Sequence, residues 1–205
     1  MKEQFEAKRL AILRAAFDVV SAKGYSDTKV DDIAAGAGVA KGTVYLYFKD
    51  KPAIYVGLAD WLLEQAVAVI RDTAARPLSP RAKLALIFED WSKTLLSRPA
   101  VMSLLSMQNV DQTTEVMHRF KKLVMPHMRE MVTEIAAIVA DGIRAGEFRR
   151  VDPQVAALMY LDSFRTRMFA LAHGIVDRDP GPMVQELFFC GILANAGSRS
   201  KRKAG

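Results

Sequence analysis

Apolar residues recur at helical spacing along most of the chain. Between residues 6 and 23, Leu10, Leu13, Phe17 and Val20 share one side, because steps of three and four residues return to the same face of an α-helix. Gly24 then supplies a left-handed stop. Strand-like alternation bounded by turn residues is absent from the sequence. The pattern therefore predicts an all-α fold of about nine helices.

Capping residues and prolines divide the second part of the chain. Asp50, Ser79 and Asp152 stand where helix caps are expected, each with a proline in the first turn that follows. Residues 76–80 form the strongest interruption, and we expect an elbow or a domain boundary there. Pro126 should kink or split the long helical pattern around it. The expected helices cover residues 51–75, 80–97, a short segment ending near 108, 115–145, 153–172 and 183–196.

Residues 28–48 carry a tighter pattern. Thr28 stands as an N-cap, and Asp31 can answer it as a glutamate does in a capping box. Gly38 falls where a turn requires positive φ, which glycine adopts at no steric cost. Small and apolar residues on both sides of this turn let two short helices cross closely. They are Val30, Ile33, Ala34, Ala37, Val39, Val44 and Phe48. The stretch predicts a helix-turn-helix.

Such a unit places its second helix in the major groove of DNA. Gly42 lets the backbone approach the duplex, and Thr43 can meet a phosphate, a base edge or a thymine methyl group. The lysines that follow the helix are expected to meet phosphates. The residues expected to contact DNA are Thr28, Lys29, Lys41, Gly42, Thr43, Tyr45, Tyr47, Lys49 and Lys51.

Each of these features by itself also fits an ordinary helical domain. A tyrosine can simply be packed, and a lysine after a helix is usually solvated. The capped helix, the glycine turn, the aromatic helix and the lysines occur in this order within residues 28–51. That combination favours DNA binding.

The same residues resemble the tetracycline-repressor (TetR) family of transcriptional regulators. The resemblance covers about a quarter of the chain. It is carried by residues 11–16, 24–30, 32–34, 37–39 and 41–51. A looser resemblance to the C-terminal domain of that family lies in residues 141–149.

The resemblance implies an all-helical homodimer with a variable C-terminal domain that binds a small effector. It also implies repression of transcription that is relieved by the effector. On this basis we expect a helix-turn-helix domain at residues 1–51 and an effector-binding and dimerisation domain at residues 52–197. Residues 198–205 are expected to form a basic, disordered tail.

A partner surface is also expected because two-fold dimers place two recognition helices about one DNA turn apart, about 34–36 Å. The last two predicted helices are apolar nearly all round, which indicates burial on more than one side. The alternative is a deeply buried core helix in a monomer. The candidate interface residues are Leu158, Leu161, Phe169, Val184, Leu187, Phe188 and Ile192.

Methionines and aromatic residues are concentrated in the middle of the second predicted domain. Methionine fills irregular space and is common on promiscuous binding surfaces. Ordinary core packing is the competing interpretation for each residue. The candidate lining of an apolar effector pocket is Phe88, Trp91, Met102, Met107, Met117, Phe120, Met128, Met131, Tyr160, Phe164 and Met168.

The net charge of +6 adds little to this picture. Most of the excess comes from the tail, where Arg199, Lys201, Arg202 and Lys203 occur without any acid. No run of apolar residues is long enough for a membrane span, and the N-terminus has no apolar signal core. With one cysteine, Cys190, no internal disulfide can form. A cytoplasmic protein is expected.

Signs of enzymatic chemistry are missing from the sequence. His118, His127 and His173 lack metal-ligand spacing, and no glycine-rich phosphate loop or nucleophile elbow occurs. We therefore expect no cofactor, no metal and no catalytic site. The leading hypothesis is a homodimeric repressor of a palindromic operator, released by a small, largely apolar effector. The alternatives are a dimeric regulator without an effector, and a helical enzyme or small-molecule-binding protein with an incidental helix-turn-helix.

Overall fold

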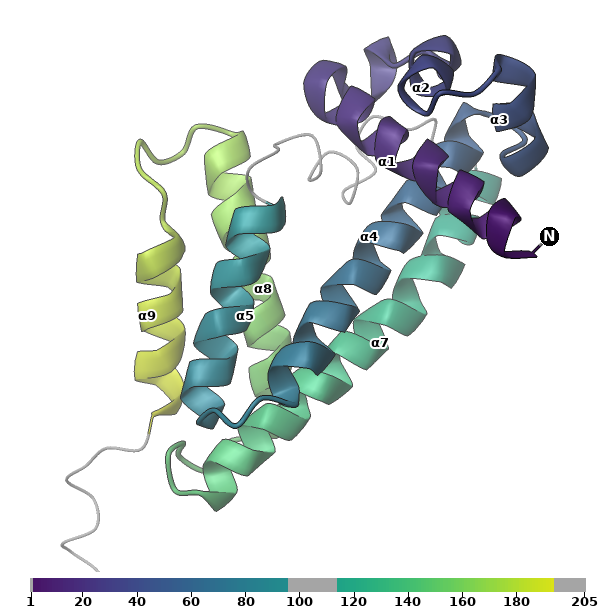
Figure 1. Ribbon diagram of the computed structural model, residues 1–205. Coiled ribbons are helices and arrows are strands. Elements are labelled where there is room, and N and C mark those ends of the chain that lie inside the picture. Colours follow the sequence, from purple (N-terminus) through teal and green to yellow (C-terminus); the bar gives the residue numbers. More distant parts are fainter. Residues whose placement is uncertain (1, 96–113, 194–205) are drawn as a thin grey trace, which may run out of the picture. The chain divides into compact units, whose positions relative to one another are not determined.

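The computed structural model describes residues 2–95 and 114–193 (Figure 1). In these ranges it contains eight helices and no strand, which confirms the all-α prediction. The short helix expected before residue 108 lies outside the described residues. The helices are α1 (Lys2–Asp27), α2 (Val30–Gly36), α3 (Lys41–Tyr47), α4 (Lys51–Ala74), α5 (Pro80–Leu95), α7 (Thr114–Arg144), α8 (Pro153–Ala172) and α9 (Gly181–Ile192).

The chain divides into two compact units. The first comprises Met1–Ala66 with Thr94–His127, and the second comprises Val67–Lys93 with Met128–Gly205. The first unit extends past the domain boundary expected at residue 51, because Ile54, Leu58 and Leu62 of α4 are buried in the same core as α1, α2 and α3.

The predicted caps form at the starts of three helices. The Asp50 carboxylate accepts a hydrogen bond from Ala53 N, and the Ser79 hydroxyl accepts one from Ala82 N. The Asp152 carboxylate accepts from the N–H groups of Gln154 and Val155. Each cap satisfies N–H groups that have no partner within their helix. These helices therefore begin within a residue or two of where the sequence places them.

Of the kink or split expected at Pro126, the split does not occur, because the long helix α7 continues through the proline. Proline in a helix removes one backbone hydrogen bond and costs about 3 kcal/mol. Beyond the proline, Met131, Ile135 and Val139 repeat at four-residue steps and are buried. Burial of such an apolar stripe can outweigh the local cost.

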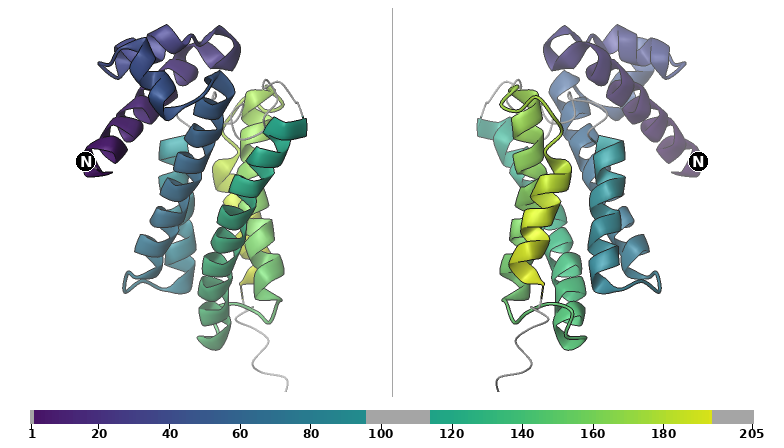
Figure 2. Two further views of the ribbon diagram at one scale, coloured as in Figure 1. Left: turned by 90° about the vertical axis from the view of Figure 1, so that its right-hand side faces the viewer. Right: turned by 90° about the vertical axis from the view of Figure 1, so that its left-hand side faces the viewer.

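The second unit is built around α5, α8 and α9 (Figure 2). The Tyr160 hydroxyl of α8 donates a 2.6 Å hydrogen bond to the Leu84 carbonyl of α5. Its ring lies 5.2 Å from the ring of Phe188 on α9. Burial raises the pKa of Tyr160 well above its ordinary value, so it stays a neutral donor.

Helix α4 is long and apolar enough to cross a membrane by length and composition alone. However, 56% of its most apolar window is buried inside the protein. Ile54, Leu58 and Ile70 are nearly fully buried. The helix therefore has the character of a core helix.

Candidate nucleic-acid interface

The turn between α2 and α3 is closed by Gly38, as the sequence predicts. Its φ is 65°, in the left-handed region that favours glycine. Gly38 N donates to the Ala35 carbonyl, and Val39 N donates to the Ala34 carbonyl. This pair of bonds is the Schellman arrangement, which satisfies the last carbonyls of a helix. It also fixes the direction in which α3 leaves α2.

The start of α2 differs from the prediction. The N-cap position is Lys29, and no side chain caps the helix. The Thr28 hydroxyl instead donates a 2.6 Å bond to the Gly24 carbonyl, where α1 is interrupted. Only 3% of Thr28 is exposed. The predicted capping role of Thr28 is therefore wrong, and its hydroxyl is already engaged inside the unit.

Helix α3 is held by Val44 and Phe48, which are both buried in the core of the first unit. The opposite side of the helix is exposed. Tyr45 is 45% exposed and Leu46 is 78% exposed, while Lys41 and Gly42 are exposed at the N-terminal end. A side chain added at Gly42 would meet no protein atom within 4 Å. The protein's own packing therefore does not require glycine there.

Two tyrosines predicted to contact DNA have different surroundings. Tyr45 points away from the core, whereas Tyr47 is half-buried and packs against it. The Tyr47 ring also lies 4.4 Å from the ring of Phe5. Tyr45 is the freer of the two to meet a ligand.

Leu46 was missed by the sequence reasoning. Its side chain is 78% exposed, on a side of α3 that the core of the first unit does not cover. The spacing could have shown it: Val44 and Phe48 face inward four residues apart, so the residue midway between them faces outward. Leu46 belongs to the same exposed surface as Tyr45.

The lysines near α3 are exposed, and one of them, Lys41, forms an ion pair with Asp31. Lys41 Nζ lies 2.9 Å from Asp31 Oδ2, and this hydrogen bond raises the pKa of Lys41. Both side chains are more than half exposed, so a phosphate could replace the carboxylate as the partner of Lys41. Three further residues were predicted to contact DNA. Lys29 and Lys49 are exposed, and Thr43 is half-buried.

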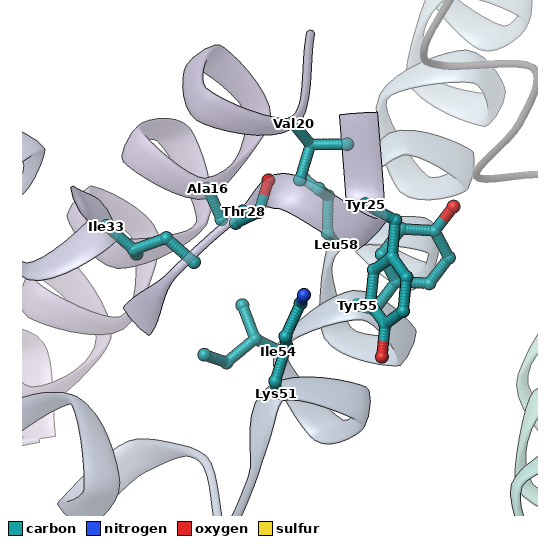
Figure 3. Close-up of a pocket in the computed structure, with 9 residues that line it drawn as sticks. All are labelled: Ala16, Val20, Tyr25, Thr28, Ile33, Lys51, Ile54, Tyr55 and Leu58. Atoms are coloured by element: carbon teal, nitrogen blue, oxygen red, sulfur yellow. The ribbon is translucent and has the colours of Figure 1, made fainter. Parts of the chain in front are cut away.

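Lys51 is held inward. Its Nζ donates a 3.1 Å bond to the Ser26 carbonyl and lies 4.4 Å from the centre of the Tyr25 ring. Burial lowers the pKa of Lys51, while the Asp27 charge acts in the opposite direction. Figure 3 shows its side chain at a small cavity shared with Thr28 and Tyr55. Lys51 thus ties the start of α4 to the end of α1.

That cavity holds about 10 Å³, which is room for no more than one water molecule. Its lining is mostly apolar and comes from α1, α2 and α4. It is a packing defect of the core and is too small for an organic effector.

Two family models match the chain. The model described as bacterial regulatory proteins of the tetR family matches residues 12–58, which contain the whole helix-turn-helix. The model described as a tetracyclin repressor-like C-terminal domain matches residues 110–173. The chain belongs to the TetR family.

Individual relatives agree with this family. The fatty acid metabolism regulator protein of Bacillus subtilis is 25% identical over 158 residues, which is 77% of this chain and 79% of that protein. FadR from Bacillus subtilis, in complex with stearoyl-CoA, has a TM-score of 0.70 at 23% identity and covers 89% of this chain and 98% of its own. A SmeT–triclosan complex has a TM-score of 0.64 at 20% identity and covers 93% of each chain. The family assignment makes this chain a DNA-binding transcriptional regulator rather than an enzyme.

The predicted effector-binding residues of this TetR-family chain are partly described. Phe88, Trp91, Tyr160 and Phe164 form one aromatic cluster in the second unit, with ring centres 4.4–6.5 Å apart. Met131 and Met168 are buried in the same unit, and Met128 is half-buried. Met102 and Met107 lie outside the described residues, as do the side chains of Met117 and Phe120.

A buried arginine in this unit was also missed. Arg167 is 7% exposed, and its guanidinium forms a bidentate ion pair with Asp179. The guanidinium carbon also lies 5.9 Å from the centre of the Phe88 ring. The sequence pattern gives no sign of this burial, because the 12-residue separation between Arg167 and Asp179 is not a regular spacing.

The predicted dimer residues fall into two groups. Leu158, Phe169 and Leu187 are exposed large apolar side chains on α8 and α9, at 49%, 53% and 66%. Leu161 and Val184 are half-buried. Phe188 and Ile192 are buried within the protomer itself, and the Phe188 ring packs against the ring of Tyr160 on α8. The exposed group is the one left for a partner.

Proposed function

We propose that the chain is a homodimeric repressor that acts in the cytoplasm, binds a palindromic operator, and leaves it when a small, largely apolar effector binds. The observation that carries the DNA part is the exposed side of α3, opposite the anchors Val44 and Phe48. A helix held only from behind can enter the major groove with its free face forward.

We assign base recognition to Gly42, Thr43, Tyr45 and Leu46. Leu46 and the methyl group of Thr43 suit a thymine methyl group, and the Tyr45 hydroxyl can exchange a hydrogen bond with a base edge or a phosphate. Tyr47 contributes through its half-exposed edge. Lys29, Lys41 and Lys49 contact phosphates, which position the protein without reading sequence.

The dimer is supported by the apolar side chains that α8 and α9 leave exposed. Leu158, Met159, Phe169 and Leu187 each show about half or more of their surface. Large apolar patches on a soluble protein mark interaction sites. A second copy of the same surface fits a two-fold interface, which is self-complementary.

The effector is supported by the aromatic cluster and by relatives. FadR of Bacillus subtilis was solved with stearoyl-CoA and SmeT with triclosan, both with large apolar portions. In this chain the cluster around Phe164 lies in the second unit, away from α3 in sequence. An effector bound there would release DNA only through a change of conformation or of dimer geometry.

The test is a gel-shift titration of the full chain on DNA that flanks its own gene. The proposal predicts a shift that survives excess non-specific competitor, and its loss in Tyr45→Ala. The absence of a competitor-resistant shift on any palindromic fragment would refute it.

A second arm adds stearoyl-CoA to the shifted complex, with free coenzyme A as the matched polar control. Release by the acylated compound alone supports an apolar effector. A shift that no apolar compound releases would favour a regulator whose C-terminal domain only dimerises.

A further inference from the structure

Three side chains with metal-ligating chemistry meet between α4 and α7, away from the helix-turn-helix. His127 Nε2 lies 2.9 Å from Asp60 Oδ1, although the two residues are 67 positions apart in the sequence. One ligating atom from each of Asp60, Glu64 and His127 lies within 4.8 Å of the others. All three residues belong to the first unit.

The two carboxylates lie four residues apart on α4, so they share one face of the helix. Like charges at this spacing destabilise a helix by about 0.2–0.5 kcal/mol. A cation between them would remove this repulsion. Asp60 and His127 are also sheltered, with 19% and 17% of their side chains exposed, while Glu64 is at the surface.

The ligand types select the metal. Imidazole nitrogen suits zinc, copper, iron and nickel, whereas magnesium and calcium prefer oxygen ligands alone. We propose that Asp60, Glu64 and His127 bind a first-row transition-metal dication such as Zn²⁺. In this site the His127 ring supplies the nitrogen ligand, and each carboxylate supplies one oxygen.

The distances are compatible with such a site after small side-chain movements. Zinc bonds of about 2.0–2.2 Å place tetrahedral ligand atoms about 3.3–3.6 Å apart. The His127–Asp60 separation is below this range, and the exposed Glu64 side chain can rotate to close the remaining distance. The ion would join α4 to α7 within the first unit and keep at least one position for water.

The competing explanation is an ordinary hydrogen bond between His127 and Asp60 with a solvated Glu64 beside it. In that arrangement Glu64 would take no part in binding an ion. Glu64→Gln therefore separates the two explanations, because it removes a charged ligand at the surface and leaves the His127–Asp60 pair and the core in place.

The experiment is a calorimetric titration of the chelator-treated, dialysed full chain with Zn²⁺, and separately with Mg²⁺. Co²⁺ serves as a spectroscopic probe, since its visible bands report nitrogen and oxygen ligation directly. The variants are Glu64→Gln and His127→Ala. The matched control is His118→Ala, which removes an exposed histidine of the same helix.

The proposal predicts one Zn²⁺ per chain, with binding weakened at least about tenfold in Glu64→Gln and in His127→Ala. Binding should be unchanged in His118→Ala, and Mg²⁺ should bind far more weakly. The absence of Zn²⁺ binding, or Zn²⁺ binding that survives Glu64→Gln, would overturn it. Because metal binding is read directly, this result is independent of whether the chain binds an operator.

Discussion

At the residue scale, α3 separates side chains that hold the helix from side chains that are free to meet DNA. Val44 and Phe48 are committed to the core, while Tyr45 and Leu46 are not. Gly42 shows this freedom most clearly, because the fold leaves open space where a side chain at this position would be. A requirement for glycine there must come from something outside the chain.

Gly42→Ala should therefore separate folding from DNA binding. Alanine is favoured over glycine in a helix by up to about 1 kcal/mol, so the melting temperature should stay the same or rise. The added methyl group would stand between the backbone and the duplex, and operator affinity should fall at least about tenfold, by about 1.4 kcal/mol. Thermal unfolding and a binding titration on the same sample check this. Full operator affinity in Gly42→Ala would show that the backbone does not approach DNA closely.

The two lysines after α3 should respond differently to truncation. Lys49→Ala should weaken binding to all sequences and reduce the salt slope by about one unit, because an exposed phosphate contact is lost. Lys51→Ala should chiefly lower thermal stability, because Lys51 already binds the Ser26 carbonyl and the Tyr25 ring. Binding measured at several salt concentrations distinguishes them. A full unit of slope lost in Lys51→Ala would place that lysine among the phosphate contacts.

The residue-scale differences from the sequence prediction have a common cause. Spacing along one helix could identify Val44 and Phe48 as anchors and Tyr45 as outward-facing. It could not decide between an N-cap at Thr28 and a local bond from Thr28 to Gly24. It could not show that Lys51 bonds to Ser26, because that contact depends on how α4 packs against α1. The motif residues were thus predictable, but which of their polar side chains are engaged inside the unit and which are left exposed was not.

At the element scale, local signals placed most helix boundaries. Asp50, Ser79 and Asp152 cap the helices that they were expected to cap, because a cap needs only its own first turn. Pro126 does not end α7, because burial of Met131, Ile135 and Val139 beyond the proline can offset its local cost. The start of α9 was placed two residues late, since proline is tolerated in a first turn.

The connection between α8 and α9 should be sensitive to pH through Asp179. Its hydrogen bond to the Arg167 guanidinium lowers the pKa of this carboxyl group below 3.8, while burial acts in the opposite direction. A lowered folded-state pKa means that the stabilisation is fully present above the unfolded pKa and is lost as pH falls through the folded pKa. The stabilisation should thus be complete near neutral pH and decline as pH falls below about 4, the pKa of an aspartate in the unfolded chain.

Asp179→Asn should lower the free energy of unfolding by about 1–2 kcal/mol at pH 7, a value reduced because the carboxylate is half exposed. Urea unfolding at pH 7 and pH 3 should show the difference shrinking at the lower pH. Asp162→Asn, in the exposed pair with Arg165 on α8, is the control and should change little. A difference of the same size at both pH values would mean that the charge of Asp179 is not what matters.

At the scale of the whole molecule, the proposed dimer places the exposed apolar side chains of α8 and α9 against a second copy of the chain. Leu187→Glu should produce a folded monomer, because this side chain is 66% exposed in the protomer. Operator affinity should fall at least about 100-fold, since linked half-sites gain that much from simultaneous binding. Analytical ultracentrifugation and circular dichroism check mass and fold.

Leu78→Glu is the control and should remain dimeric, because Leu78 is exposed in the connection between α4 and α5. A Leu187→Glu protein that is still a dimer would remove α9 from the interface.

The sequence predicts a partner surface, because α8 and α9 are apolar nearly all round. It could not separate Phe169 and Leu187, which remain exposed, from Phe188 and Ile192, which the protomer buries. That division depends on which side of each helix packs inside the protomer. The sequence could identify the aromatic residues of the cluster as candidates for the effector pocket. It could not show their contact with the buried Arg167.

The most direct test of the central claim is selection of binding sites from a random pool of duplex DNA by the purified full chain. The account predicts enrichment of a two-fold symmetric site whose half-site centres lie about one helical turn apart, or a multiple of that. Selection with Tyr45→Ala should lose the consensus while keeping salt-sensitive non-specific binding. No enrichment over the starting pool, or a consensus without symmetry, would contradict a dimer that reads DNA with α3.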